Sequence, residues 1–148
     1  MPSDVSNTLQ PPQSSTTNQS TAQQHLQELP VTLINADAPY QKCAKFGFDA
    51  ELKFRGTLCA GASSHGVACQ INFRIAQKVV VATDVTLDEF HNSVSFHTVY
   101  GFWSGNLFVS VENWPTDRCL QVAWRGEGVL PTEKPMQINW HKHLFCLG

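Results

Sequence analysis

Apolar and polar side chains alternate along several short stretches of the chain. Residues 46–54 alternate in this way, and residues 67–75 place their apolar side chains on one face. A period of two residues is the pattern of a strand with one face in a core and the other in solvent. Residues 78–83 form a nearly continuous apolar run, which predicts a strand buried on both faces.

More stretches of this kind follow along the chain, separated by turn residues such as Gly, Pro, Asn and Ser. They predict strands at residues 31–34, 56–61, 93–99, 106–111, 119–124, 136–140 and 143–147. Residues 84–92 have no clean period and are predicted to form a loop. No stretch carries the longer period of an amphipathic helix. The pattern therefore predicts an all-β fold, an antiparallel β-sandwich over residues 31–148.

The first 30 residues differ in composition from the rest. They are rich in Ser, Thr, Gln, Asn and Pro and contain no Lys, Arg, Phe, Tyr or Trp. Such a segment has too little apolar surface to offset the entropy lost on ordering. We therefore expect residues 1–30 to form a disordered polar tail in front of a single domain.

The charge of the chain is close to balanced. The formal net charge is −2, and from residue 37 onward ten acidic residues face ten basic ones. Nucleic-acid binding depends on clustered Lys and Arg, so the sequence carries no strong nucleic-acid signature. No apolar run approaches the length of about 20 residues that spans a bilayer. The beginning of the chain also lacks the pattern of a signal peptide.

The cysteines bear on the expected location. There are five of them, an odd number, whereas small secreted domains built on disulfides usually carry an even set. We therefore expect mainly buried free thiols and a non-secreted protein.

No group of residues forms a recognisable catalytic or metal-binding motif. Ser104 follows Gly-Phe-Trp and precedes Gly, which differs from the Gly-x-Ser-x-Gly elbow of esterases. His141 and His143 would share one face of a strand near Cys146, but no Cys-x-x-Cys pair accompanies them. The acidic stretch at residues 84–89 lacks the ligand spacing of a calcium loop. We expect no enzyme activity, no cofactor and no metal.

The four tryptophans are the most prominent candidates for binding. Trp103, Trp114, Trp124 and Trp140 lie within predicted strands or at their ends. Such residues anchor cores, anchor interfaces between subunits, or stack on sugars, and the first two roles are the commoner ones. Trp114 precedes a proline at an expected loop tip, which makes it the candidate for an exposed platform. Arg118, at the start of the following strand, completes the set of possible interface or ligand residues.

Residues 93–146 carry a pattern of strands, aromatic and Gly-bearing segments, and an Arg-led apolar strand. In outline, this pattern resembles the second half of the jelly-roll domain in coat proteins of picorna-like viruses, with the comoviruses and nepoviruses nearest. The matching parts are Phe96 and residues 102–107, 118–124, 126–131 and 136–140. The resemblance implies a jelly-roll-like sandwich that forms a shell with other coat subunits, as a homo- or hetero-oligomer. It also implies a virion or host-cytoplasm location and no strongly basic arm.

A second resemblance leads to a different function. Residues 70–74, Gln-Ile-Asn-Phe-Arg, share the Asn and Arg of the galectin strand His-x-Asn-Pro-Arg. Residues 124–127, Trp-Arg-Gly-Glu, contain the residues of a second galectin segment, Trp-Gly-x-Glu-x-Arg, in a different arrangement. This implies a galectin-like carbohydrate-binding sandwich as the alternative. A β-domain that binds another protein partner also remains open.

Overall fold

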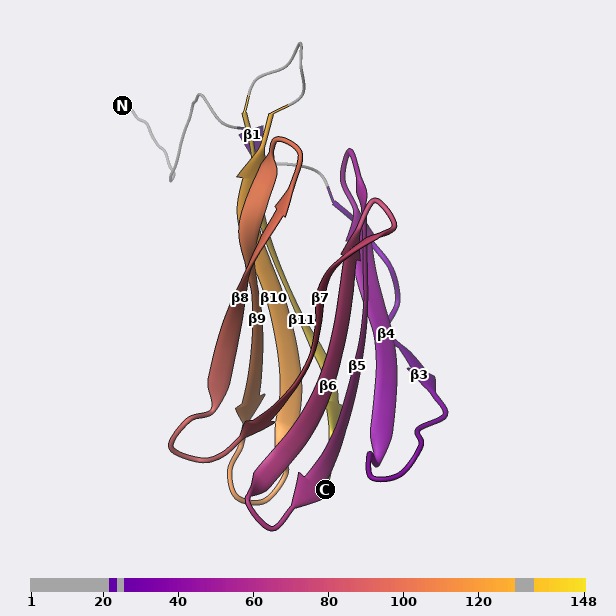
Figure 1. Cartoon of the computed structure of the whole chain (residues 1–148), viewed down its shortest axis with the longest axis vertical. Helices are drawn as coiled ribbons and strands as arrows, with labels where there is room; N and C mark the ends of the chain where they lie inside the picture. The colour runs from indigo at the N-terminus through magenta and orange to yellow at the C-terminus, as the bar shows by residue number, and fades with distance from the viewer. Residues whose placement is uncertain (1–21, 24–25, 130–134) are drawn as a thin grey trace, which may run out of the picture.

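A computed structural model describes residues 22–23, 26–129 and 135–148. It shows two β-sheets packed face to face (Figure 1). The six-stranded sheet holds β2 (Gln27–Glu28), β3 (Thr32–Ile34), β4 (Lys42–Asp49), β5 (Lys53–Ser63), β6 (Gly66–Ile75) and β7 (Lys78–Leu87). The five-stranded sheet holds β1 (Ala22–Gln23), β8 (Ser93–Tyr100), β9 (Trp103–Glu112), β10 (Cys119–Gly128) and β11 (Met136–Cys146). In the part of the chain that is described, no helix is long and apolar enough to cross a membrane.

The predicted antiparallel β-sandwich is confirmed, and its strand order is simple. Strands β4 to β7 follow one another across one sheet, and β8 to β11 follow one another across the other. All of these neighbours are antiparallel; the short β1 pairs in parallel with β11. A jelly roll instead contains two Greek keys, in which a later strand returns to lie beside an earlier one. The two long-stranded layers are therefore consecutive meanders.

The prediction that residues 78–83 form a fully buried strand is wrong. Strand β7 is the last strand of its sheet and pairs only with β6 among the described strands. Val79 is 48% exposed, and only Val81 and Leu87 of this strand are buried. A short apolar run does not distinguish a strand covered on both faces from one at the edge of a sheet.

The predicted boundary at residue 30 also needs correction. Residues 1–21 and 24–25, to which most of the tail prediction applies, lie outside the described residues. Strand β2 pairs with the end of β4, and the Leu29 N–H donates to the Gly47 carbonyl at 3.0 Å. The Glu28 carboxylate accepts a hydrogen bond from Trp140 Nε1 at 2.9 Å. The packed part of the chain thus begins before residue 31.

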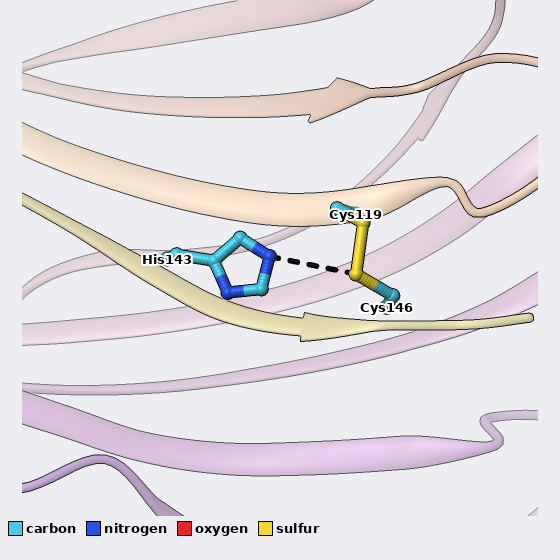
Figure 2. Close-up of side chains that lie close together, drawn as sticks. All are labelled: Cys119, His143 and Cys146. Carbon is cyan, nitrogen blue, oxygen red and sulfur yellow. Dashed lines mark hydrogen bonds between the residues drawn. A yellow bond between two sulfur atoms is a disulfide. The ribbon is translucent and has the colours of Figure 1, made fainter.

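Four of the five cysteines form disulfides, so the prediction of mainly free thiols is wrong. Cys43 bonds to Cys59 between β4 and β5, and Cys119 bonds to Cys146 between β10 and β11 (Figure 2). In both cases the two residues are directly opposite each other in the strand register. Only Cys69 is a free thiol, and it is buried. An odd count requires one unpaired cysteine, but it does not reveal which others face each other across a sheet.

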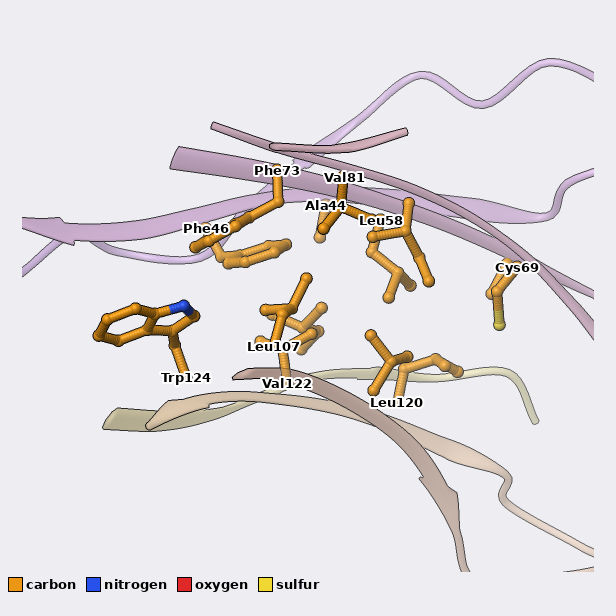
Figure 3. Close-up of a cluster of buried hydrophobic side chains, with 14 of the residues drawn as sticks. Ala44, Phe46, Leu58, Cys69, Phe73, Val81, Leu107, Leu120, Val122 and Trp124 are labelled. Carbon is orange, nitrogen blue, oxygen red and sulfur yellow. The ribbon is translucent and has the colours of Figure 1, made fainter. Parts of the chain in front are cut away.

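Aliphatic and aromatic side chains together fill the space between the sheets (Figure 3). The ring centroids of Phe48 and Phe54 are 4.4 Å apart, and the ring centroid of Trp124 lies 4.9 Å from that of Phe54. Trp140 lies 4.9 Å from Phe48, so rings from both layers interlock. Burial of large rings contributes most of the stabilisation that a core of this kind provides.

Glycines make room for these rings. Gly56 is the register partner of Phe46 in β4, and a Cβ atom at Gly56 would overlap the Phe46 ring. Gly128 stands in the same relation to Trp103. Each large ring therefore lies over the bare backbone of the neighbouring strand.

Candidate functional site

The two candidates considered first, Ser104 as a nucleophile and the His143–Cys146 region as a metal site, lack the partners that these roles need among the described residues. Ser104 lies on the outer face of β9, and among the described residues no hydrogen bond joins its side chain to a histidine. His143 Nε2 lies 3.4 Å from Cys146 Sγ (Figure 2), in the one cluster of three ligand-type residues found in the described ranges. Because the Cys119 and Cys146 sulfurs are bonded to each other, neither offers a thiolate to a metal ion.

Of the acidic residues at 84–89, Asp84 lies within β7, and Asp88 shapes the turn that follows this strand. Asp88 Oδ1 accepts hydrogen bonds from the backbone N–H groups of His91 at 2.7 Å and Phe90 at 2.9 Å. These bonds favour the ionised carboxylate and lower the pKa of Asp88. The carboxylate thereby organises the loop that leads into β8.

Three of the four tryptophans have the core-anchor role, one of the two commoner roles considered for them. Trp103, Trp124 and Trp140 are buried between the sheets and have no surface to offer a ligand or a partner. Trp114 is half-buried, and its Nε1 donates to the Val111 carbonyl at 2.8 Å. The sequence identified these residues as large anchors but could not show on which face of each strand they lie.

Arg118 has a role in the chain turn before β10. Its backbone has a positive φ of 48°, and its N–H donates to the Asn113 carbonyl at 3.0 Å. Its own carbonyl accepts from the Leu147 N–H at 3.2 Å, which connects this turn to the segment after β11. Arg118 therefore contributes to local structure through its backbone.

The surface feature with the clearest functional meaning is one side of the sandwich, where β7 and β8 end their respective sheets. The two strands contact each other, and neither has a second partner strand in the described part of the chain. We call these two strand edges the open margin. On the opposite side, β4 pairs with β2 and β3, and β11 pairs with β1. These short strands pair with five residues of β4 and with Met136 and Gln137 of β11, and the rest of β11 has no partner on that side among the described residues. In the described part of the chain, β7 and β8 are the edge strands that lack any such cover.

The hydrogen-bond register shows which groups β8 presents to the outside. The Val111 N–H donates to the Asn92 carbonyl at 2.9 Å, which makes these residues a hydrogen-bonded pair. Such pairs alternate along an antiparallel ladder. It follows that the N–H and C=O groups of Ser93, Ser95, His97 and Val99 point away from β9, and no other described strand pairs with them.

Apolar side chains accompany these unpaired groups. Seven large hydrophobic residues are exposed in the described ranges, and four of them lie on β7, β8 or the turns that adjoin them. They are Val79 (48% exposed), Phe90 (86%), Val99 (51%) and Phe102 (76%). The open margin therefore combines free backbone groups with most of the exposed apolar side chains.

No family model, curated protein or solved structure matches this chain.

Two of the hollows on the outer faces of the sheets contain residues that bear on binding. One, of about 510 Å³, is on the five-stranded sheet and is lined by residues that include His97, Asn106, Arg125, Glu127 and Asn139. The other, of about 430 Å³, is on the six-stranded sheet and contains Asn72 and Arg74 of the galectin-like stretch. The alternation of residues 67–75 predicts that Asn72 and Arg74 share one face of a strand, as they do in the structure. It gives no indication that Lys45 and Arg55 lie beside them.

Proposed function

We propose that this protein is a structural subunit that assembles with further copies, or with related subunits, through its open margin. The observation that carries the proposal is the composition of β8 at an uncovered edge. Its eight residues, Ser-Val-Ser-Phe-His-Thr-Val-Tyr, contain no Lys, Arg, Asp, Glu, Pro or Gly.

An uncovered strand of this composition is hazardous for an isolated protein. Its free N–H and C=O groups are a template for another strand. Natural proteins protect such edges with lysines, prolines, bulges or covering segments. Strand β8 has none of these residues, and its register with β9 shows no bulge. A partner strand would satisfy the free backbone groups and cover Val99 and Phe102, both of which are exposed in the single chain.

The coat-protein type of assembly has narrower support. The resemblance of residues 93–146 to coat-protein strands covers β8 to β11. It is a resemblance in the succession of strands along the chain, and it does not extend to the strand order, which differs from that of a jelly roll. Two disulfides favour oxidising surroundings, which include virion and cell surfaces, over the cytosol. We therefore propose a coat-type subunit that acts in such surroundings.

The test is the size of the purified protein and of two edge variants, by light scattering after size exclusion and by negative-stain imaging. Val99→Lys adds a charge to the edge. Ser95→Pro removes an N–H that points away from β9 and therefore leaves the internal ladder intact. Gln121→Lys is the matched control, because it adds the same charge to β10, which is paired on both sides.

We expect discrete oligomers or shells for the unmodified protein and for Gln121→Lys, and monomers for the two edge variants. A monomeric unmodified protein at all concentrations would contradict the proposal. Oligomers that persist in both edge variants, with native circular dichroism, would also contradict it, because the contact would then lie elsewhere.

A further inference from the structure

The hollow on the outer face of the six-stranded sheet has an unusual charge. It extends over β4, β5 and β6, and the segment that connects β2 to β3 forms one wall. Its lining residues are Leu29, Pro30, Thr32, Lys45, Phe46, Arg55, Gly56, Thr57, Asn72 and Arg74. We call it the basic groove, because three of these residues are cationic and none is acidic.

The three cations differ in how they are held. Arg55 forms an ion pair with Asp49 at 2.8 Å and donates to the carbonyls of Phe48 at 3.2 Å and Phe54 at 3.0 Å. Its aliphatic stem lies against Gly47, which is opposite it in the register. By contrast, neither Lys45 nor Arg74 forms an ion pair with any residue in the described ranges.

Arg55 and Arg74 are directly opposite each other on neighbouring strands. Like charges in this position repel each other and destabilise a sheet. In the described ranges, the only ion pair of these two arginines is that between Arg55 and Asp49. An anion bound between Arg74, Arg55 and Lys45 would relieve the repulsion and supply the missing counter-charge.

The neutral residues of the groove narrow the class of ligand. Thr57 is the register partner of both Lys45 and Asn72, so a hydroxyl and an amide lie in one row with an ammonium group. The hydroxyl and the amide both donate and accept hydrogen bonds, and the ammonium group donates them, as sugar hydroxyls require. The only aromatic residue of the lining, Phe46, is 3% exposed and stacks on Phe73 and Trp140 in the core. The groove therefore lacks the ring platform on which nucleic-acid bases stack.

We propose that the basic groove binds a sulfated glycan. Arg74 and Lys45 hold a sulfate group, Arg55 adds a fixed positive charge, and Thr57 and Asn72 hydrogen-bond to sugar hydroxyls. The groove lies on a sheet face, whereas the open margin is formed by strand edges. The inference therefore goes beyond the assembly function and does not rest on it.

The test measures binding of the full chain to low-molecular-weight heparin by surface plasmon resonance at about 0.15 M ionic strength, where exposed charges more than about 8 Å apart are largely screened. The variants are Arg74→Gln and Lys45→Gln. Arg125→Gln is the matched control, because it removes one exposed charge from the outer face of the other sheet. Desulfated heparin and a single-stranded RNA homopolymer serve as competing ligands, and light scattering confirms that all variants have the same oligomeric state.

We expect each groove variant to bind heparin about fivefold more weakly, the effect of losing one exposed ion pair of about 1 kcal/mol. Arg125→Gln should bind as the unmodified protein does, and desulfated heparin should bind more weakly than heparin. Three results would overturn the proposal. They are no binding of heparin, an equal loss in Arg125→Gln, or tighter binding of the RNA than of heparin, which would assign the groove to nucleic acid.

Discussion

Trp124 donates its indole N–H to the hydroxyl of Thr98 at 2.9 Å, in the middle of the core. Thr98 is the only buried polar residue in the described part of the chain, and its hydroxyl donates in turn to the Gly105 carbonyl at 3.0 Å. The Trp124 ring lies against Gly105 on the neighbouring strand β9 and against Gly126, two residues further along its own strand. The Thr98 hydroxyl thus gives the buried indole N–H of Trp124 its hydrogen-bond acceptor. It also links β10 to the edge strand β8 across β9.

Replacing Thr98 by valine should be costly although the shape of the side chain is kept. The substitution leaves the Trp124 N–H buried without an acceptor, which costs about 1–3 kcal/mol of unfolding free energy. Chemical denaturation followed by tryptophan fluorescence measures this loss. Thr98→Ser keeps the hydroxyl and should lose less than half as much. Equal losses in the two variants would mean that packing of the methyl group, and not the hydrogen bond, matters here.

Adding one methyl group at Gly56 should disturb the core from the opposite strand. The new Cβ atom would overlap the Phe46 ring, which must then shift against Phe73 and Trp140. Overpacking of this kind costs about 1–3 kcal/mol, and the melting temperature of Gly56→Ala should fall accordingly. Gly148→Ala is the control, since its Cβ atom would come no closer than 3.8 Å to Arg118. An unchanged melting temperature in Gly56→Ala would show that the ring has room to move.

The Glu28 carboxylate should stabilise the fold mainly as a hydrogen-bond acceptor. It accepts from Trp140 Nε1 at 2.9 Å, while Lys142 Nζ is farther away, at 3.7 Å. Glu28→Ala should therefore lower the unfolding free energy by about 1 kcal/mol. Glu28→Gln keeps an acceptor oxygen and should lose less, because exposed ion pairs contribute little. Denaturant titrations of both variants test this, and an equal loss would assign the effect to the ion pair with Lys142.

The free thiol of Cys69 should be inert in the folded protein. Burial raises its pKa from 9.0 to about 12, so the thiol stays protonated and unreactive at neutral pH. A thiol reagent should modify the native protein only as fast as it unfolds, and the denatured protein at once. Rapid reaction under native conditions would contradict the burial of this side chain.

The same shift predicts how stability depends on pH. Above about pH 9, the thiol of the unfolded chain ionises while that of the folded chain does not. The unfolded state then holds fewer protons, so the stability contributed by this group falls as the pH rises from about 9 towards 12. Melting temperatures between pH 8 and about 10 should fall less in Cys69→Ala than in the unmodified protein. Parallel curves would show that other groups cause the alkaline loss.

Much of the architecture was predictable from local pattern. Val67, Ile71 and Phe73 alternate with polar residues in the sequence, and all three are buried on β6. A side-chain period of two residues is a property of the strand itself, so it can be recognised without knowledge of its neighbours.

What depends on neighbouring strands was not predictable. The pairing of Cys43 with Cys59, and of Cys119 with Cys146, follows from the register of two different hairpins. The edge position of Val79 follows from the order of strands within the sheet. The basic groove needs three strands side by side before Lys45, Arg55 and Arg74 come together. None of these relationships is encoded in a window of a few residues.

The positions of the two disulfides imply an uneven resistance to local opening. One closes the hairpin of β4 and β5, and the other closes that of β10 and β11. Each lies at the side of its sheet farthest from β7 and β8, and no disulfide cross-links either of these two strands to a neighbouring strand. Strands held in this way open at lower free energy than cross-linked ones. In the single chain, amide hydrogens of β7 and β8 should exchange with solvent first, and contact with a neighbouring subunit would slow them most.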